Sequence, residues 1–416
     1  CFSDSRASAA RLGPLLTQQH EIQVVRAAMA RCAGGLTSSD TSAYLAGEVD
    51  RLTKQISSGV PDQGLRQHLE RELADTREKL ERSRAGTPFV QFADLVARRD
   101  EMAELLDRDL AERHSAKSYG QTDWNRNKDA VQKRAEALAA KELQRPLKRQ
   151  ASVESTGLVE VVYPGLQYLD IPPILEEKLP SRVRQDISGA WTSILTLLLD
   201  TVRADGCVGW SEDSNNRKWL DESPLRGRWL TRTRGGWGAR AFVGATISQL
   251  RRRFVQNVLC AAGISKAESA TLSEDVLCAA FDQLCRKAQQ TGFSWLRRED
   301  HHQTGPEEAD TAIQILFDYL SVRSPSTLFW CEATGTVWTS TALGWVPIDG
   351  CLGTVRGVGR DFLDNDPRWG RARREFMEST ILGMGLWAEE HSAQLSPHEN
   401  RRLQDLFKNG IRNVLS

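Results

Sequence analysis

Hydroxyl and charged side chains near the N-terminus have the types and spacing of a phosphate-binding loop. The sequence CFSDSR places Ser3, Asp4, Ser5 and Arg6 between an apolar dipeptide and a predicted helix, RASAARLGPLL. A helix N-terminus presents free backbone N–H groups and the positive end of a dipole, which together favour a phosphate. The same residues also fit a capped helix that simply follows a strand, so both interpretations stay open.

A second segment with similar organisation lies near the C-terminus. In EEHSAQLSPHENRRLQDLFKNGIRNVLS, polar residues follow a predicted strand and a helix begins at Pro397. His391, Ser392 and Gln394 would lie in the loop between that strand and the helix, and a further strand is predicted at 411–415. Taken alone, this segment is an αβ unit with no assigned chemistry.

An arginine- and tryptophan-rich segment in the middle of the chain has the composition of a single-strand binding surface. Residues 217–253 contain ten Lys or Arg residues and two acids, with indoles between them. Guanidinium groups follow phosphates while aromatic rings stack on bases. For Arg251, Arg252 and Arg253 we favour a solvated helix face, whereas residues 226–240 fit either interpretation. The candidate nucleic-acid contacts here are Arg226, Arg228, Trp229, Arg232, Arg234 and Trp237.

The motifs that would bind ATP or a metal do not accompany these segments. The sequence has no GxxxxGK[ST] loop and no QxxGRxGR motif, and DEMA at 100–103 falls in a predicted helix. Cys331 and Cys351 flank a Trp-rich β module, but Thr334 stands where a CxxC partner would be. We therefore expect no catalytic, cofactor-binding or metal-binding residue in this chain.

The overall composition is that of a soluble globular protein. The 416 residues include 55 Lys or Arg and 55 Asp or Glu, so net charge says nothing about partners. The longest apolar run, at 192–202, is too short for a membrane helix. Eight scattered cysteines without a CxxC pair predict neither a disulfide framework nor a zinc ribbon. We expect a reduced, cytoplasmic protein with no membrane partner.

The elements that must position these segments are mostly helical. A charged helical hairpin with one narrow apolar stripe is predicted between Tyr44 and Arg84, and 203–240 reads largely as a Gly/Trp/Arg-rich loop region. Further helices are predicted at 89–110, 124–143, 191–202, 241–263, 273–291, 307–322 and 371–377. Strands are predicted at 158–169, within a β module at 328–348, and at 385–390.

These elements group into five predicted units when the two ends of the chain, 1–30 and 380–416, are taken together as one discontinuous unit, as a family resemblance of those ends implies. Between them lie a helical hairpin and helical region at 31–146, an α-rich unit carrying the Arg/Trp segment at 147–325, a small β module at 326–356 and a connecting helix at 357–379.

The two end segments, taken as a pair, resemble the second RecA-like domain of superfamily 2 helicases. The resemblance is to large bacterial DEAD/DEAH-type helicases often found with phage-defence genes. CFSDSRASAARL is similar to the first strand and loop of that domain, and HSAQLSPHENRRLQDLFKNGIRNVLS to its second strand, loop and helix. RQASVESTGLVEVVYPGL is similar to an S-L-E-x-L-G-L-V-x-V-x-Y segment of the same proteins, with Val153 and Thr156 as departures.

The resemblance implies an α/β fold in which the two chain ends form a partial RecA-like parallel sheet. A predominantly α-helical insertion, with the helical hairpin and the small β module, would lie between them. It also implies phosphate contacts from residues 3–6 and from the loop with His391, Ser392 and Gln394. Since the sequence starts as if at the end of a strand and stops at the start of another, we expect a fragment.

The function implied is that of an ATP-dependent helicase or translocase acting on single-stranded or duplex nucleic acid, with DNA favoured. ATP and Mg²⁺ would be bound by the parent protein, while this fragment contributes backbone contacts and a strand-guiding insertion. The alternative is a non-enzymatic interaction module, in which the charged hairpin docks a partner protein of the same defence system.

Overall fold

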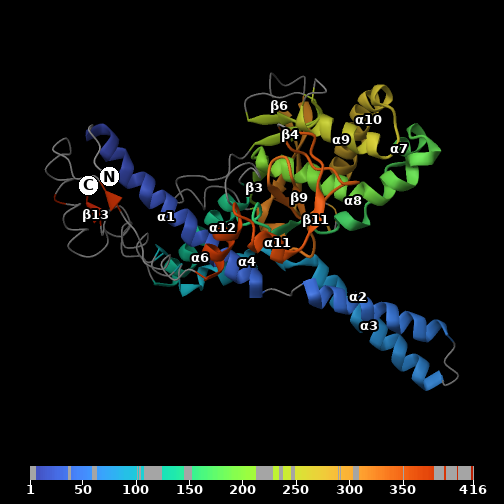
Figure 1. Ribbon diagram of the computed structural model, residues 1–416, viewed down its shortest axis with the longest axis horizontal. Coiled ribbons are helices and arrows are strands. Elements are labelled where there is room, and N and C mark those ends of the chain that lie inside the picture. The colour runs from blue at the N-terminus through green and yellow to red at the C-terminus, as the bar shows by residue number, and fades with distance from the viewer. Residues whose placement is uncertain are drawn as a thin grey trace.

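The chain forms a mixed α/β body from which two helical parts extend to opposite sides (Figure 1). This computed structural model describes residues 6–35, 39–58, 63–100, 102, 105–106, 124–144, 152–211, 228–233, 238–244, 249–288, 290, 292–302, 309–349, 351–378, 388–389, 401 and 414–415. On one side, the helix α1 (Arg6–Gly35) runs toward both chain termini. On the other, α2 (Ser39–Ser57) and α3 (Gln63–Ala85) form the predicted hairpin.

The centre of the body is a five-stranded sheet. Its longest strand, β7 (Ala309–Leu316), pairs antiparallel with β6 (Leu296–His302) along nearly its whole length. The short strand β3 (Val208–Gly209) pairs with β7 in parallel and β4 (Trp229–Thr231) pairs with it antiparallel, while β5 (Ala239–Ala241) pairs in parallel with β4.

This sheet corrects two predictions. The helix predicted at 307–322 is wrong, because Ala309–Leu316 is the strand β7. The apolar spacing of Ala312, Ile313, Ile315 and Leu316 fits a helix as well as a buried strand, and the pairing with β6 decides between them. The loop region predicted up to residue 240 contains β4 and β5. The insertion is therefore less helical than predicted.

Helices pack beside this sheet and supply most of the core. The helix α8 (Ser181–Ala204) is longer than the predicted 191–202 because its buried stripe starts earlier, at Val183 and Ile187. α9 (Leu250–Ala261) begins nine residues later than predicted, after β5, and α10 (Lys266–Lys287) begins seven residues earlier, where Ser265 accepts a hydrogen bond from the Glu268 N–H. The short α7 (Pro173–Lys178) lies against α10.

A second, three-stranded antiparallel sheet joins distant parts of the chain. β8 (Ser321–Arg323) lies between β1 (Thr87–Pro88) and β2 (Glu160–Val162). β2 is the observed part of the strand predicted at 158–169, which ends early because Gly165 turns the chain with a φ of 83° into a 3₁₀ turn at Leu166–Tyr168.

The small β module predicted at 328–348 is present. β9 (Leu328–Cys331) pairs antiparallel with β10 (Thr336–Trp338) and with β11 (Arg356–Val358). Two helices follow, α11 (Arg360–Asp364) and α12 (Gly370–Glu378), the second at the predicted position.

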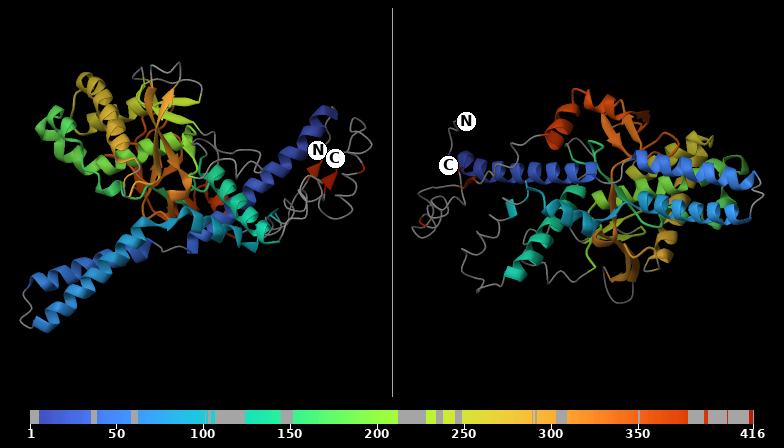
Figure 2. Two further views of the ribbon diagram at one scale, coloured as in Figure 1. Left: turned by 180° about the vertical axis from the view of Figure 1, so that it is seen from behind. Right: turned by 90° about the horizontal axis from the view of Figure 1, so that it is seen from below.

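The long helix α1 is joined to the body through α4 (Phe89–Ala97), α6 (Trp124–Leu143) and α12. A buried ion pair between Arg26 Nε and Glu142 Oε1, 2.7 Å apart, links α1 to α6. Near the chain termini, β12 (Ala388–Glu389) pairs in parallel with β13 (Val414–Leu415), and α1 contacts β12. Figure 2 shows both ends of the chain beside α1 in two further views.

Candidate nucleic-acid interface

Three of the residues predicted to contact nucleic acid have described side chains, and all three lie on or beside β4. These are Arg228, Trp229 and Arg232. Arg6 is the first residue of α1, and its side chain is not described. The other predicted contacts lie outside the described residues: Ser3, Asp4, Ser5, Arg226, Arg234, Trp237, His391, Ser392 and Gln394.

The Trp229 ring is stacked against a guanidinium group of the neighbouring hairpin. Arg297 on β6 places its Cζ 4.9 Å from the centre of this ring, and its Nη2 donates to Gln314 Oε1 at 2.8 Å. Gln314 in turn donates from Nε2 to the Arg228 carbonyl at 3.1 Å. One face of the indole is therefore occupied by a cation–π contact that the sheet itself supplies.

Arg228 and Arg251 converge on the C-terminal end of α8. Arg228 Nη1 donates to the Asp205 carbonyl at 3.3 Å, and Arg251 Nη2 lies 2.5 Å from Asp205 Oδ2. Arg251 also donates from Nε to Thr201 Oγ1 at 2.6 Å and from Nη1 to the Ala241 carbonyl at 3.0 Å. Cations are stabilised at a helix C-terminus, where the last carbonyls lack helical donors. Both arginines thus fix the end of α8 to the central sheet.

The other two arginines of the Arg251–Arg253 run are also engaged within the protein. Arg252 Nη2 lies 2.8 Å from Glu274 Oε2 on α10, and its Nη1 donates to the Gly244 carbonyl. Arg253 Nη2 donates to the Ile348 carbonyl at 2.7 Å and lies 3.1 Å from Asp349 Oδ1. The guanidinium groups of this run hold α9 to α10 and to the β module, so the run is not the solvated helix face that we favoured, and its role as a strand-binding patch stays a prediction.

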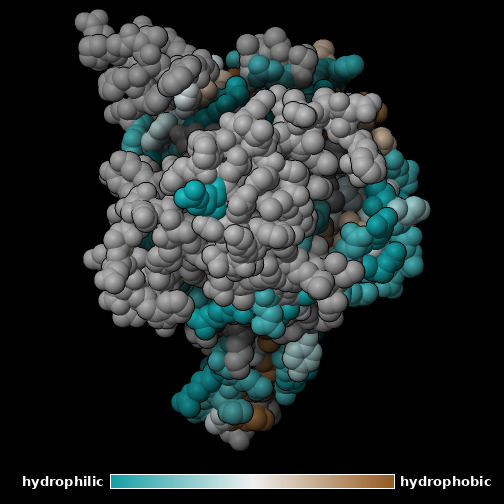
Figure 3. Space-filling model, turned by 90° about the vertical axis from the view of Figure 1, so that its left-hand side faces the viewer, coloured by the Kyte–Doolittle hydropathy of each residue, from teal (hydrophilic) through white to brown (hydrophobic). Residues whose placement is uncertain are grey.

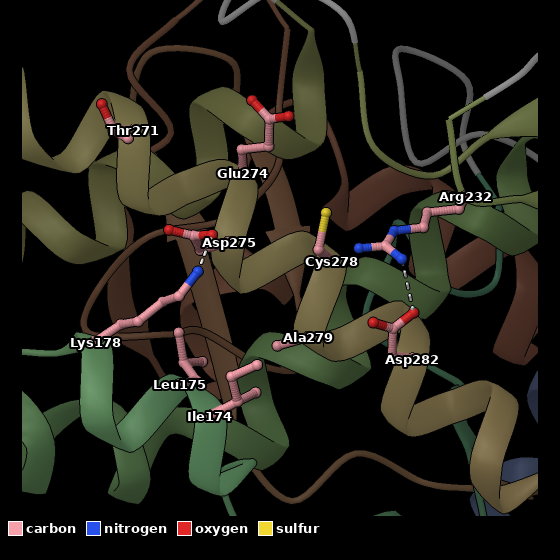
Figure 4. A pocket seen from close by; sticks show the side chains of 10 residues that line it. All are labelled: Ile174, Leu175, Lys178, Arg232, Thr271, Glu274, Asp275, Cys278, Ala279 and Asp282. Carbon is pink, nitrogen blue, oxygen red and sulfur yellow. Dashed lines mark hydrogen bonds and ion pairs between the residues drawn. The ribbon is translucent and has the colours of Figure 1, made fainter.

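Arg232 lines a cleft between α7 and α10 (Figure 4). Its Nη1 lies 3.5 Å from Asp282 Oδ1, and a hydrogen bond to the Cys278 sulfur raises the pKa of Arg232 above its usual value. Across the cleft, Lys178 Nζ lies 2.5 Å from Asp275 Oδ1. The residues lining this cavity of about 240 Å³ are Ile174, Leu175, Lys178, Arg232, Thr271, Glu274, Asp275, Cys278, Ala279 and Asp282. Two cations face three carboxylates, so the cleft does not favour a polyanion.

A buried ionic cluster that sequence reasoning missed lies under the segment SVESTGLVEVVY. Arg203 on α8 donates to both carboxylate oxygens of Glu154, at 2.6 and 2.7 Å, and also to Asp200 at 3.0 Å. Tyr163 donates its hydroxyl hydrogen to Asp200 Oδ1 at 2.8 Å and accepts one from Arg203 Nε at 3.2 Å. Burial raises the pKa of Glu154 to about 7, and the Arg203 charge opposes that rise.

The segment SVESTGLVEVVY is therefore a centre of packing and hydrogen bonding. The Ser152 N–H donates to Ser155 Oγ, and the Ser155 N–H donates back to Ser152 Oγ, which closes the turn. The departure Thr156 is fully buried and donates its hydroxyl to the Ser152 carbonyl at 2.8 Å. Glu154 lies among polar residues in the sequence, so its neighbours gave no signal of its burial, and only the folded chain shows that this acid is paired with a buried base.

No family model matches this chain, and neither the curated proteins nor the solved structures include one that is similar to it. Within the described residues, no three His, Cys, Asp or Glu side chains come together to hold a metal ion. None of the helices in the described part of the chain is both long and apolar enough to cross a bilayer.

Proposed function

We propose that the chain is part of a superfamily 2 nucleic-acid translocase whose two ends contribute to the second RecA-like domain. The observation that supports this most is the meeting of segments far apart in sequence, since α1 contacts β12 and β12 pairs in parallel with β13. A helix packed beside parallel strands is the crossover unit of an α/β sheet. In the sequence, the residues that form the body lie between α1 and β12.

In this proposal the loops at residues 3–6 and 391–394 contact the phosphates of a nucleic-acid strand. Hydroxyl groups, amides and helix N-termini fix a backbone without reading sequence, which suits a protein that moves along a strand. The parent protein would bind ATP and Mg²⁺ through motifs that this sequence does not contain. The described arginines of the central segment contribute less, because Arg228 and Arg251 bind the end of α8.

Fluorescence anisotropy with a labelled single-stranded oligothymidine tests this proposal. We expect binding whose logarithmic affinity falls linearly with the logarithm of salt concentration. Arg6→Ala and Gln394→Ala should weaken binding, and the first should reduce the salt slope by about one. Arg66→Ala is the matched control, because it removes one exposed arginine from α3. Binding that is unchanged by the two end variants would contradict the role of the chain ends.

The second candidate is the interaction module, and the position of the α2–α3 hairpin favours it. The hairpin extends away from the body in Figure 1 and in the left-hand view of Figure 2, and its surface is mostly hydrophilic where Figure 3 shows it at the bottom. Its stripe residues Leu52, Leu69 and Leu80 are buried between the two helices. A partner would therefore bind the outer surface, where Tyr44 is 69% and Leu65 48% exposed.

A pull-down with the intact chain as bait, at high salt and with nuclease, separates the two candidates. A partner retained by the wild type and lost with Tyr44→Ser or Leu65→Ser would support the interaction module. Leu352→Ser is the control, because Leu352 is also strongly exposed but lies on the β module.

A further inference from the structure

Two cysteines of the β module lie within reach of each other. Cys331 is the last residue of β9, and Cys351 lies in the segment that leads to β11. Their Sγ atoms are 3.8 Å apart, with Cys331 buried and Cys351 half-buried. The Cys351 thiol therefore has access to solvent, while the Cys331 thiol is shielded from it.

Both cysteines are held in place by main-chain interactions on opposite sides of the pair. The Gly335 N–H donates to the Cys331 carbonyl at 2.7 Å, and Cys331 pairs with Thr336 in the β9–β10 ladder. On the other side, residues 346–349 and 351–353, here called the strap, are closed by a hydrogen bond from the Val346 N–H to the Gly353 carbonyl at 2.9 Å.

The strap is also bound to α9. Arg253 Nη2 donates to the Ile348 carbonyl at 2.7 Å, and Asn257 Nδ2 donates to the Leu352 carbonyl at 2.9 Å. These contacts lie on either side of Cys351 and hold its backbone to α9, while β11, which follows the strap, pairs with β9. The closeness of the two sulfur atoms is consequently built into the module and does not depend on side-chain rotation alone.

We propose that Cys331 and Cys351 are a redox-active pair that closes reversibly into a disulfide. The oxidant is a low-molecular-weight disulfide such as that of glutathione. Cys351 loses its proton to solvent and its thiolate attacks one sulfur of the oxidant, whose S–S bond breaks and whose other sulfur leaves as a thiolate that takes up a proton. Cys331, deprotonated in turn, then attacks Cys351 Sγ and displaces the second small thiol. Two protein thiols are thereby oxidised and one small disulfide is reduced to two thiols.

The remaining cysteines with shifted pKa values are poor competitors for this reaction. Burial raises the pKa of Cys207 and of Cys285 to about 12 and that of Cys32 to about 11, which suppresses their thiolates at neutral pH. Burial also raises the pKa of Cys351, so oxidation of the pair should accelerate as the pH rises. The pair differs from these three in having a second sulfur at hand, which resolves the mixed disulfide within the molecule.

A closed disulfide would tie the strap to β9 covalently. Because the strap carries the carbonyl groups that accept from Arg253 and Asn257, oxidation would also lock the β module onto α9. The rigidity of the contact between the β module and α9 would therefore depend on the redox state of the surroundings.

The test treats the intact chain with mixtures of reduced and oxidised glutathione, quenches with acid, alkylates the free thiols and maps the peptides by mass spectrometry. We expect a single Cys331–Cys351 disulfide that is lost on return to reduced glutathione. The rate of its formation should rise as the pH is raised from about 7 to about 9. Cys331→Ala should leave a glutathione adduct on Cys351 that forms no internal disulfide. Cys260→Ala, at another half-buried cysteine, should leave the reaction unchanged.

Several results would overturn the proposal. One is a glutathione adduct on Cys351 that persists in the wild type while Cys331 stays alkylatable. Another is a disulfide that maps to other cysteines. A third is a zinc ion that co-purifies in stoichiometric amount and whose removal by a chelator is required for any oxidation. The wild-type mapping does not depend on how well the Cys331→Ala variant folds.

Discussion

Arg203 holds both carboxylate oxygens of Glu154 in the interior, at 2.6 and 2.7 Å, and so ties α8 to the turn that precedes β2. The guanidinium also donates to the Leu143 carbonyl at the end of α6. Three segments that are separate in sequence therefore depend on one buried cation. The stability of the fold depends on the presence of both partners of such a pair, because losing one partner leaves the other charge buried without compensation.

Replacing Glu154 with Ala should destabilise the protein by about 3–5 kcal/mol, since Arg203 would keep its charge without its main partner. Urea unfolding followed by tryptophan fluorescence and circular dichroism measures this loss. Glu177→Ala on the exposed face of α7 is the control and should change the unfolding free energy by less than about 0.5 kcal/mol. Equal unfolding midpoints for the two variants would show that the buried pair is not needed for stability.

The same acid should make stability depend on pH. Burial raises the pKa of Glu154 from its usual 4.5 to about 7 in the folded protein, so the folded state binds more protons than the unfolded state between these values. The stabilisation from this group is then complete below about pH 4.5 and is lost as the pH rises through about 7. In Glu154→Gln this part of the pH dependence should vanish. Parallel stability profiles for the wild type and this variant from pH 5 to 8 would contradict the assignment.

Gly157→Ala should destabilise the turn between the buried cluster and β2. The residue has a φ of 67°, and a Cβ added there would lie 2.7 Å from Leu328 Cδ2. The left-handed conformation alone costs an alanine about 1–2 kcal/mol, and the contact adds to it. Gly189→Ala in α8 is the matched control, because a Cβ there meets nothing within 4 Å. It should leave stability unchanged or raise it by up to about 1 kcal/mol. Thermal denaturation of both variants decides the point.

Arg251→Ala should lower the free energy of unfolding more than it lowers the free energy of nucleic-acid binding. The reason is that the Arg251 guanidinium binds Asp205, Thr201 and the Ala241 carbonyl. A loss of about 2–4 kcal/mol in unfolding free energy is expected for a nearly buried charged hydrogen-bonding group. Arg240→Ala, at an exposed position on β5, should leave stability within about 0.5 kcal/mol. If Arg251→Ala instead weakened oligothymidine binding at unchanged stability, the arginine run would be a strand contact after all.

Leu69→Ala should open the α2–α3 hairpin, since Leu69 is buried between two helices that extend away from the body. Limited proteolysis should cut this variant within residues 39–85 faster than the wild type, while the thermal midpoint of the body changes little. Tyr44→Ala removes an exposed ring and serves as the control. Unchanged proteolysis for Leu69→Ala would mean that the hairpin does not depend on its internal stripe.

The hairpin and the small β module could be predicted from the sequence because both are local. Leu45, Val49, Leu52 and Ile56 repeat at helical spacing, and the Trp/Thr/Val-rich residues 328–338 alternate around a tight turn. The five-stranded sheet was missed because its evidence is non-local. β4 and β5 have three residues each, and β7 is recognisable as a strand only through its partner β6. Propensity and spacing do not contain such pairings.

The unusual composition of the candidate interface was predictable from the sequence, but the groups that its arginines bind were not. The density of arginine and tryptophan marked residues 217–253 correctly as unusual, yet the described arginines of that segment mostly bind carbonyl groups and acids of the body. Asp205, Glu274 and Asp349 come from three different segments, so only the folded chain brings them to the arginines. The short motif around Glu154 was noted in the sequence only for a resemblance, and the core ion pair that Glu154 forms with Arg203 was not predicted.

The contact between α1 and β12 has a consequence for how the molecule is made. The helix leaves the ribosome before the body, whereas β12 and β13 follow only after the whole body has been synthesised. Domains fold as they emerge, so α1 must first pack against α4 and α6, where Arg26 pairs with Glu142. It contacts β12 only later, when that strand has been synthesised. Closing so long a loop is cheap once the body has folded and shortened the distance. The order of synthesis thus makes α1 and the body a template on which β12 and β13 are assembled last.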